Sequence, residues 1–335
     1  MSCFLRFLFL FCLARFALGG LVSVTLVTRH GDRTGLHVVP QMENPWPILG
    51  QLTGTGMRQH YDLGVKIRAR YASFIPDVFN TSAIALRSTS VERTLQSAES
   101  LLQGLFPEGS GPVLPDGNSS LPHQIQVFPI MSSQKDDDFV MRSYDICPRV
   151  EAMRVPLVYQ APDWIAAMQA NSDLLDLLAN LSGFDRPMAV EHFNWVADYL
   201  LCRRQQGLGL YPGVTDEIYD RTISLHSWIQ TRKFPSDRAF CRASIGPFVA
   251  ELLSNWKSDL AHKADARLFR LYSAHDTTLI ALMTALKSPI PAPYYASHTL
   301  FELYASDEAH ASPYVRVLYN FQPCNIPGCG AADCP

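Results

Sequence analysis

Three short runs of apolar and β-branched residues set the strongest limit on how this sequence can fold. They cover residues 21–27, 83–86 and 268–272, and each stops at sequence rich in arginine, histidine or serine. Runs of this kind are typical of buried strands. A helical pattern follows each run, at residues 56–71 after the first. Strands that alternate with helices in this way predict an α/β fold.

The polar residues that end these runs are expected to meet in space. In α/β sheets, ligands bind beyond the carboxyl ends of the strands. This geometry predicts that one rim of the sheet holds six residues that lie far apart in the sequence: Arg29, His30, Arg33, Arg87, His275 and Asp276. Thr89 can cap the helix after the second run, with Glu92 as its capping-box partner.

Residues 1–20 have the pattern of a secretory signal peptide. An apolar run at 7–11 follows Arg6, and small residues come after it at Ala17, Gly19 and Gly20. The segment is too short and too interrupted for a good membrane span. A buried first strand that continues into residue 21 is the alternative. The signal predicts export through the secretory pathway.

Cysteine and asparagine positions agree with an exported chain. Six cysteines follow the signal, an even number that suggests disulfides. No Cys-x-x-Cys spacing with nearby paired histidines occurs, which disfavours zinc. Cys329 and Cys334 are close enough to close a small loop. Three sequons predict N-glycosylation, at Asn80, Asn118 and Asn180.

The middle of the chain differs from its two ends in composition and residue pattern. Residues 150–257 are rich in leucine with little β-branched alternation, which predicts a mostly helical insertion. The α/β domain is then discontinuous, built from residues 21–149 and 258–335. The net charge is −3 and no stretch concentrates lysine and arginine. This disfavours nucleic acid as a partner, because nucleic-acid-binding proteins usually present a basic face.

The residues expected at the rim suit phosphoryl transfer. Arginine presents a planar fork that matches phosphate oxygens, and three arginines around one point suit a phosphoryl dianion. His30 can act as an in-line nucleophile, and Asp276 can give a proton to the leaving oxygen. His275 can hydrogen-bond the phosphoryl group. Taken singly, each residue has another interpretation: lone arginines often form surface ion pairs, and a His-Asp pair can simply begin a helix.

Four motifs, in order along the chain, resemble those of the histidine phosphatases. Residues 29–33, Arg-His-Gly-Asp-Arg, match the RHGxR signature, and residues 50–61 resemble the segment that follows it in the acid-phosphatase branch. Residues 87–94 resemble the second arginine motif. Residues 272–278, Tyr-Ser-Ala-His-Asp-Thr-Thr, resemble the His-Asp motif. The resemblance extends over nearly the whole chain after the signal and is close to the prostatic and lysosomal acid phosphatases.

The resemblance implies a phosphoglycerate-mutase-like fold, with a mixed sheet flanked by helices and a smaller helical domain inserted. It also implies an acid phosphatase that hydrolyses phosphate monoesters or phosphopeptides through a phosphohistidine on His30, with Asp276 as proton donor. Phosphate binding would fall to Arg29, Arg33, Arg87 and His275, and no metal or other cofactor is required. Family members are secreted or lysosomal and commonly homodimeric. Some relatives continue past the position of residue 335 into a membrane anchor, which this chain does not contain.

Two cysteine positions depart from the family pattern. A cysteine usually lies just before the Glu-Leu-Tyr motif, and here His298 takes its place. Its usual partner, Cys202, would then pair with Cys241 instead. Cys147 usually bonds a cysteine farther downstream, for which Cys324 is the substitute.

Several further residues near the motifs receive no catalytic role. A fixed carboxylate in a dianion pocket would repel substrate, so we expect Asp32 to point away from it. Arg93 is assigned to helix packing or an ion pair. Phe193 and Trp195 either line a specificity pocket or pack in the core.

Two other functions are compatible with the same residues. A phytase or inositol-polyphosphate phosphatase would share the catalytic core, but its highly anionic substrate calls for many lysines. None occurs between Lys135 and Lys233. A catalytically silent secreted binding protein would be expected to lack one of the six rim residues, and all six are present.

Overall fold

The computed structural model describes residues 20–306, 312–329 and 333–335. Apart from Gly20, the predicted signal peptide lies outside the described residues. No helix in the described ranges is long and apolar enough to cross a membrane.

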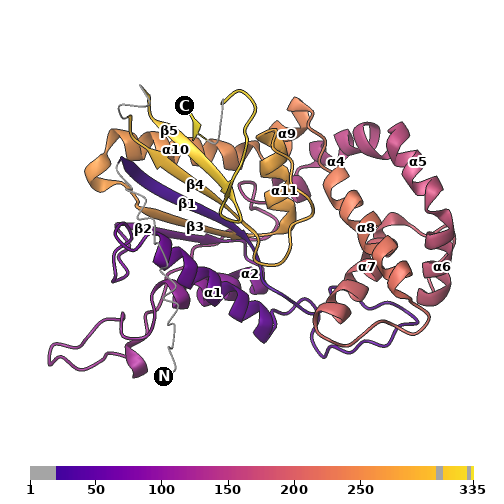
Figure 1. The fold of residues 1–335 in the computed structure, drawn as a ribbon, viewed down its shortest axis with the longest axis horizontal. Helices are drawn as coiled ribbons and strands as arrows, with labels where there is room; N and C mark the ends of the chain where they lie inside the picture. The colour runs from indigo at the N-terminus through magenta and orange to yellow at the C-terminus, as the bar shows by residue number, and fades with distance from the viewer. Residues whose placement is uncertain (1–19, 307–311, 330–332) are drawn as a thin grey trace, which may run out of the picture.

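The three predicted runs form the parallel part of a mixed sheet (Figure 1). They are β1 (Leu21–Arg29), β2 (Ile84–Ser88) and β3 (Phe269–Ala274). β3 lies between the other two, so that Arg29 is level with Ala274, and Ser88 with Ser273. The carboxyl ends of the three strands therefore meet at one rim.

Beyond β1 the sheet continues with antiparallel strands. β4 (His298–Tyr304) pairs with β1, and β5 (Tyr314–Tyr319) pairs with β4. Two short strands, β6 (Gln322–Pro323) and β7 (Asp333–Cys334), both pair with β5. The predicted α/β class with a mixed sheet is confirmed.

Helices cover both faces of this sheet (Figure 1). On one face, α1 (Gly54–Arg70) and α2 (Glu92–Leu105) bury Ile67 and Leu101 in one core cluster with Leu26 of β1.

On the opposite face, Phe248 and Leu279 join a cluster with Val27. They come from α10 (Gly246–Ala261) and α11 (Asp276–Ala285), beside which α3 (Ser143–Ile146) and α9 (Arg238–Ser244) pack.

A second group of helices extends beyond the end of the sheet (Figure 1). It has a separate core that contains Leu178, Phe193 and Ile229. The group comprises the turn η2 (Val155–Tyr159), α5 (Pro162–Ala170), α6 (Ser172–Ser182), α7 (Val190–Gln205) and α8 (Asp216–Arg232). α4 (Pro148–Arg154) leads into it, but buries Val150 in the core that covers the sheet. The remaining short turns in the described chain are η1 (Pro122–Gln124) and η3 (Lys263–Asp265).

The apolar residues of α10 bear on where the helical insertion ends. The predicted insertion, residues 150–257, includes α9 and most of α10. Phe248 and Leu252 of α10, however, lie in the core that covers the sheet. We therefore propose that the inserted unit ends between α8 and α9, while its two boundaries stay predictions.

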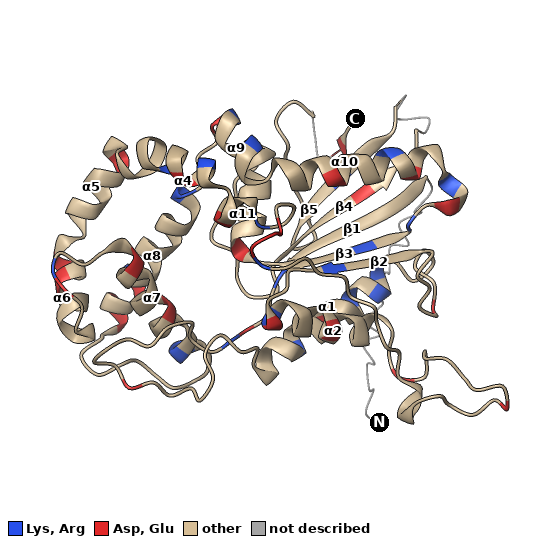
Figure 2. Cartoon of the chain, turned by 180° about the vertical axis from the view of Figure 1, so that it is seen from behind, with Lys and Arg blue, Asp and Glu red and all other residues tan. Residues whose placement is uncertain are grey.

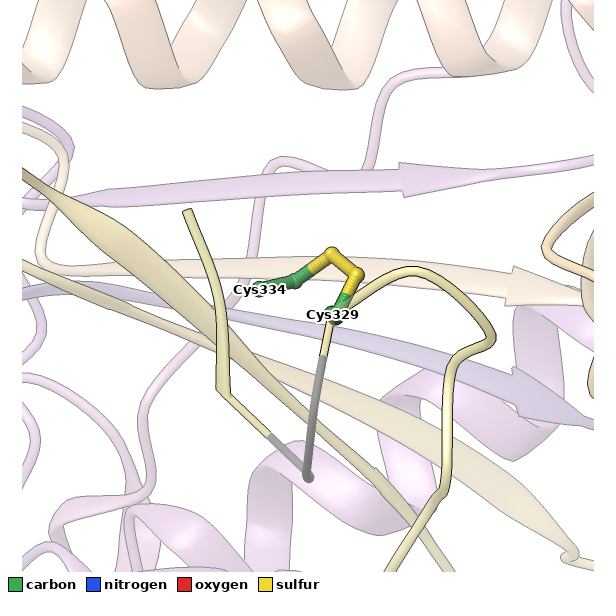
Figure 3. Close-up of a disulfide and its surroundings, with 2 residues drawn as sticks. All are labelled: Cys329 and Cys334. Atoms are coloured by element: carbon green, nitrogen blue, oxygen red, sulfur yellow. A yellow bond between two sulfur atoms is a disulfide. The ribbon is translucent and has the colours of Figure 1, made fainter.

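One disulfide, Cys329–Cys334, is present among the described cysteines, as predicted (Figure 3). The expected bridges Cys202–Cys241 and Cys147–Cys324 are wrong for this structure, because all four thiols are free. The Cys202 thiol instead lies 3.4 Å from the Tyr295 hydroxyl, and the Cys241 thiol lies 3.6 Å from the Pro235 carbonyl oxygen.

The three predicted glycosylation sites are accessible. Asn80, Asn118 and Asn180 are all exposed. Glycosylation itself remains a prediction.

Candidate active site

A cavity of about 850 Å³ lies between the rim of the sheet and the inserted helices. Charged residues of both signs gather where the strands converge, beside α11 (Figure 2). Five of the six predicted rim residues line this cavity: Arg29, His30, Arg33, His275 and Asp276. Arg87 is not among its lining residues.

Close backbone contact fixes the loop that carries His30. The His30 N–H donates to the Ala274 carbonyl at the end of β3, at 3.1 Å. A Cβ atom at Gly31 would lie 2.4 Å from the carbonyl oxygen of Gly56, so only glycine fits without a shift of the backbone. The first residues of α1 thus pack directly against this loop and hold it at the rim.

His30 is held as a neutral imidazole with a defined tautomer. Its side chain is buried, and burial followed by the charges of Arg29 and Arg93 lowers its pKa well below the usual value. Its Nδ1 lies 2.8 Å from the Gly31 carbonyl oxygen. Because a carbonyl can only accept, Nδ1 carries the proton and Nε2 keeps its lone pair. That arrangement suits a nucleophile.

Arg29 bridges the nucleophile loop to Asp276. Its Nη2 lies 2.9 Å from a carboxylate oxygen of Asp276, and its Nη1 donates to the Pro293 carbonyl. The guanidinium also lies 4.4 Å from the centre of the Tyr295 ring, within cation–π range.

Arg33 is paired with Asp198 of α7. Its two terminal nitrogens donate to the two oxygens of that carboxylate at 2.7 and 3.1 Å. Although burial alone would favour the neutral forms, the pairing raises the pKa of Arg33 and lowers that of Asp198.

Arg93, to which no catalytic role was given, lines the cavity. It stands in the first turn of α2, whose start lies at the same rim as the end of β2. Burial, followed by the charge of Arg33, lowers its pKa to about 10. A cation at a helix N-terminus is electrostatically unfavourable, and this placement is the sequence signal that could have identified it.

Arg87 faces away from the cavity, which corrects the prediction that it binds phosphate. It lies at the expected end of β2, but its guanidinium donates to Glu251 of α10 at 2.8 Å and pairs with Asp138 at 3.3 Å. Successive side chains of a strand point to opposite faces. The position of Arg87 near the rim was predicted correctly, but the face of the sheet to which its side chain points was not.

Four of the arginines that line the cavity keep an unpaired Nε–H. The Nε atoms of Arg29, Arg33, Arg93 and Arg142 have no hydrogen-bond partner among the described residues. Buried N–H groups are rarely left unpaired in proteins, so each is a donor for a bound acceptor. Arg29, Arg33 and Arg93 are also the arginines whose charges act on His30, so this part of the cavity suits an anion.

His275 and Asp276 begin α11 at the same rim. The His275 ring centre lies 5.8 Å from that of His30, and its Nε2 lies 3.0 Å from the Thr89 hydroxyl. Thr89 therefore supports His275 and does not cap α2 as predicted, because that helix starts at Glu92 without a side-chain cap.

The surroundings of the Asp276 carboxyl group favour its ionised form. Burial favours its neutral form, but Arg29 and then His275 outweigh burial and hold the pKa of Asp276 well below its usual range. Asp32, by contrast, lies outside the cavity and accepts a hydrogen bond from Thr53 at 2.6 Å.

The inserted helices supply the outer wall of the cavity. Trp195 lines it and stacks on His37, with ring centres 4.2 Å apart, whereas Phe193 is fully buried in the helical core. Lys233 and Glu191 also line this wall. Across the described residues, no cluster of histidine, cysteine and carboxylate side chains could hold a metal ion.

Comparison with known proteins identifies the family of this arrangement. The model of the histidine phosphatase superfamily, branch 2, matches residues 20–203 and 242–320. A lysosomal acid phosphatase from Xenopus laevis is 32% identical, over 93% of this chain and 73% of its own length. A prostatic acid phosphatase from Mus musculus is also 32% identical, over 93% of this chain and 83% of its own.

Solved structures share the fold at lower sequence identity. The phytase from Citrobacter braakii aligns with a TM-score of 0.67 and 16% identity, covering 93% of this chain and 95% of that chain. The Hafnia alvei phytase in complex with tartrate gives a TM-score of 0.62 and 17% identity, covering 95% of each chain. At these identities the likeness concerns the fold alone.

Proposed function

The chain is a histidine acid phosphatase of branch 2 of the histidine phosphatase superfamily, and we propose that it hydrolyses phosphate monoesters through a phosphohistidine on His30. The observation that carries this assignment of residues is the set of unpaired donors. Arg29, Arg33 and Arg93 each keep an unpaired Nε–H and line the same cavity as His30, a neutral histidine whose Nε2 has a free lone pair.

The arginines bind the substrate through its phosphoryl oxygens. Charged hydrogen bonds of this kind are worth about 1.5–3 kcal/mol each, and they stabilise the charge on the transferring group. Arg93 takes the place that the sequence interpretation gave to Arg87. His275 adds a fourth contact if its Nε2 exchanges the Thr89 hydroxyl for a phosphoryl oxygen.

The first step transfers the phosphoryl group to the protein. The lone pair on Nε2 of His30 attacks phosphorus, the bond between phosphorus and the ester oxygen breaks, and that oxygen takes a proton from Asp276. In the second step a water molecule attacks phosphorus and gives a proton to the Asp276 carboxylate. The P–N bond then breaks, which restores neutral His30 and releases inorganic phosphate.

Substrate binding itself prepares Asp276 as an acid. In the free enzyme the ion pair with Arg29 holds Asp276 ionised. A phosphoryl dianion competes for Arg29 and brings negative charge beside the carboxylate, and both changes raise the pKa of Asp276. An acid pH optimum follows, because the donor has to be protonated in the substrate complex.

Simple monoesters, including phosphopeptides, are the proposed substrates. For a highly anionic leaving group the outer cavity offers little spare positive charge, because Arg142 is paired with Asp145 at 2.9 Å and Glu191 lines the same cavity. Secretion or delivery to the lysosome, glycosylation and a homodimer complete the proposal, supported by the signal pattern, the exposed sequons and the family.

The test is hydrolysis of p-nitrophenyl phosphate at acid pH, in the presence and absence of EDTA. We expect EDTA-insensitive activity that His30→Ala abolishes, together with a phosphorylated intermediate that can be trapped in the wild type. His123→Ala is the matched control, since His123 is exposed and does not line the cavity. Full activity in His30→Ala would refute the nucleophile, and faster release of phosphate from phytate than from monoesters would refute the substrate class.

A further inference from the structure

Asp198 occupies an unusual place for a carboxylate. It lines the phosphate-binding cavity, yet a fixed negative charge there repels a dianionic substrate. Asp198 belongs to α7 of the inserted helices, not to the sheet that carries the proposed catalytic residues. A carboxylate in that position needs a role that offsets its repulsion of the substrate.

The contacts of Asp198 show what this role can be. Its two oxygens accept from both terminal nitrogens of Arg33, and one of them also accepts from the Leu36 N–H at 2.9 Å. Such a two-bond fork fixes the plane and the direction of a guanidinium. With both terminal nitrogens held, the donor that Arg33 retains without a partner in the described chain is its Nε–H.

The surroundings of the pair favour a role for Asp198 in orienting the Arg33 side chain over simple neutralisation of its charge. Arg33 and Asp198 are both nearly inaccessible to solvent, and the Arg33 Nη1 also donates to the Thr34 carbonyl at 3.0 Å. Cys202, one turn after Asp198, places its thiol 3.5 Å from the same nitrogen. Arg33 therefore has little freedom to turn its terminal nitrogens toward a ligand.

Resting on the proposed function, we propose that Asp198 is a positioning residue, which makes the inserted helical unit part of the phosphate site. Through its fork, Asp198 aims the Arg33 Nε–H at the phosphoryl group without touching the substrate. The inserted unit thus supplies more than the outer wall of the cavity, because it sets the geometry of a phosphate ligand that comes from the sheet domain.

The chain provides a matched control for this inference. Asp259 of α10 forms the same fork with Arg270 of β3, at 2.6 and 2.8 Å, and likewise accepts from a backbone N–H, that of Arg267, at 3.3 Å. Both partners are buried and neither lines the cavity. Asp259→Asn therefore reproduces the loss of a buried fork without affecting the phosphate site.

The experiment compares wild type, Asp198→Asn and Asp259→Asn, with inorganic phosphate as the probe. Phosphate affinity is measured by direct titration and by competitive inhibition of p-nitrophenyl phosphate hydrolysis. We expect Asp198→Asn to weaken phosphate binding and to lower kcat/KM by about 10- to 100-fold, by analogy with the loss measured for hydrogen-bond partners of metal-ligating side chains. Asp259→Asn should stay within about threefold of wild type in both measurements.

A double variant separates positioning from a general structural role. If Asp198 acts through Arg33, then Asp198→Asn added to Arg33→Gln lowers phosphate affinity no further. If Asp198→Asn does not fold, two other variants take its place. They are Asp198→Glu, and the combination of Asp198→Asn with Arg33→Gln, which removes both charges of the ion pair together. The glutamate, one methylene longer, should weaken phosphate binding while leaving the protein folded.

Each outcome decides the question. Wild-type phosphate affinity in Asp198→Asn or Asp198→Glu, full additivity with Arg33→Gln, or an equal loss in Asp259→Asn overturns the role of Asp198. A wild-type protein that binds phosphate but hydrolyses no monoester refutes the proposed function alone, because the titrations still test Asp198. A wild-type protein that does not bind phosphate refutes both.

Discussion

The exchange of roles between Arg93 and Arg87 gives the sharpest test of the site. The same substitution, Arg93→Gln and Arg87→Gln, removes one positive charge at each of two positions six residues apart. Arg93 lines the cavity with an unpaired Nε–H, whereas Arg87 is held by Glu251 and Asp138 on the other face of the sheet. We therefore expect Arg93→Gln to lower activity without lowering stability, and Arg87→Gln to lower stability with little effect on activity.

The expected magnitudes follow from these contacts. Arg93→Gln removes at least one charged hydrogen bond to the phosphoryl group, worth about 1.5–3 kcal/mol, which corresponds to a loss of about 10- to 150-fold in kcat/KM. Its stability should rise slightly or stay unchanged, because a buried cation crowded by Arg33 disappears. Arg87→Gln leaves the buried Asp138 carboxylate without its cation, which should lower the free energy of unfolding by about 2 kcal/mol.

Two measurements on each variant suffice. Steady-state hydrolysis of p-nitrophenyl phosphate gives kcat/KM, and urea unfolding gives the free energy of unfolding. We expect Arg93→Gln to be stable and slow, and Arg87→Gln to be less stable but within about threefold of wild-type kcat/KM. A large loss of kcat/KM in Arg87→Gln, with near-normal Arg93→Gln, would refute the reasoning from the cavity.

Three further predictions test other parts of the structure. Asp276→Asn should lower kcat far more for an alkyl phosphate than for p-nitrophenyl phosphate, whose leaving group needs no proton; equal losses on the two substrates would argue against the donor role. His60→Gln should make stability less dependent on pH. Burial lowers the pKa of His60 to about 3, so at acid pH the unfolded chain binds a proton that the folded chain does not. As the pH falls below about 6.5, wild type should thus lose about 1 kcal/mol per pH unit more than the variant, and equal slopes in urea unfolding would contradict this. Cys329→Ser should leave kcat/KM unchanged and lower stability by no more than about 2–3 kcal/mol, since its loop is short; a large loss of activity would show that the loop supports the site.

The sheet and its rim could be predicted because strand and helix signals are local. The runs that form β1, β2 and β3 are apolar and β-branched, and the carboxyl ends of parallel strands necessarily meet. His30 and the His275-Asp276 pair follow from that geometry alone. Their roles in the reaction remain proposals, supported by the hydrogen bonds and charges around them.

The arginine assignment and the disulfides were harder, because they depend on contacts distant in the sequence. Arg87 lies at the end of its strand, but the carboxylates of Glu251 and Asp138, which attract it, come from segments far along the chain. The pairing of Cys202 likewise depends on a tertiary neighbour, Tyr295, that no local pattern reveals.

Differences in the ion pairing of Arg29, Arg33 and Arg93 explain why these arginines are not equivalent. Arg33 is tied to Asp198, which has no part in proton transfer, so its position is the same with or without substrate. Arg29 is tied to Asp276, the proposed acid, so binding of a phosphoryl group has to disturb that pair. Arg93 forms no ion pair among the described residues and offers its charge to the substrate without competition. Of the three, only Arg29 can therefore connect the arrival of the substrate with protonation of the group that completes the reaction.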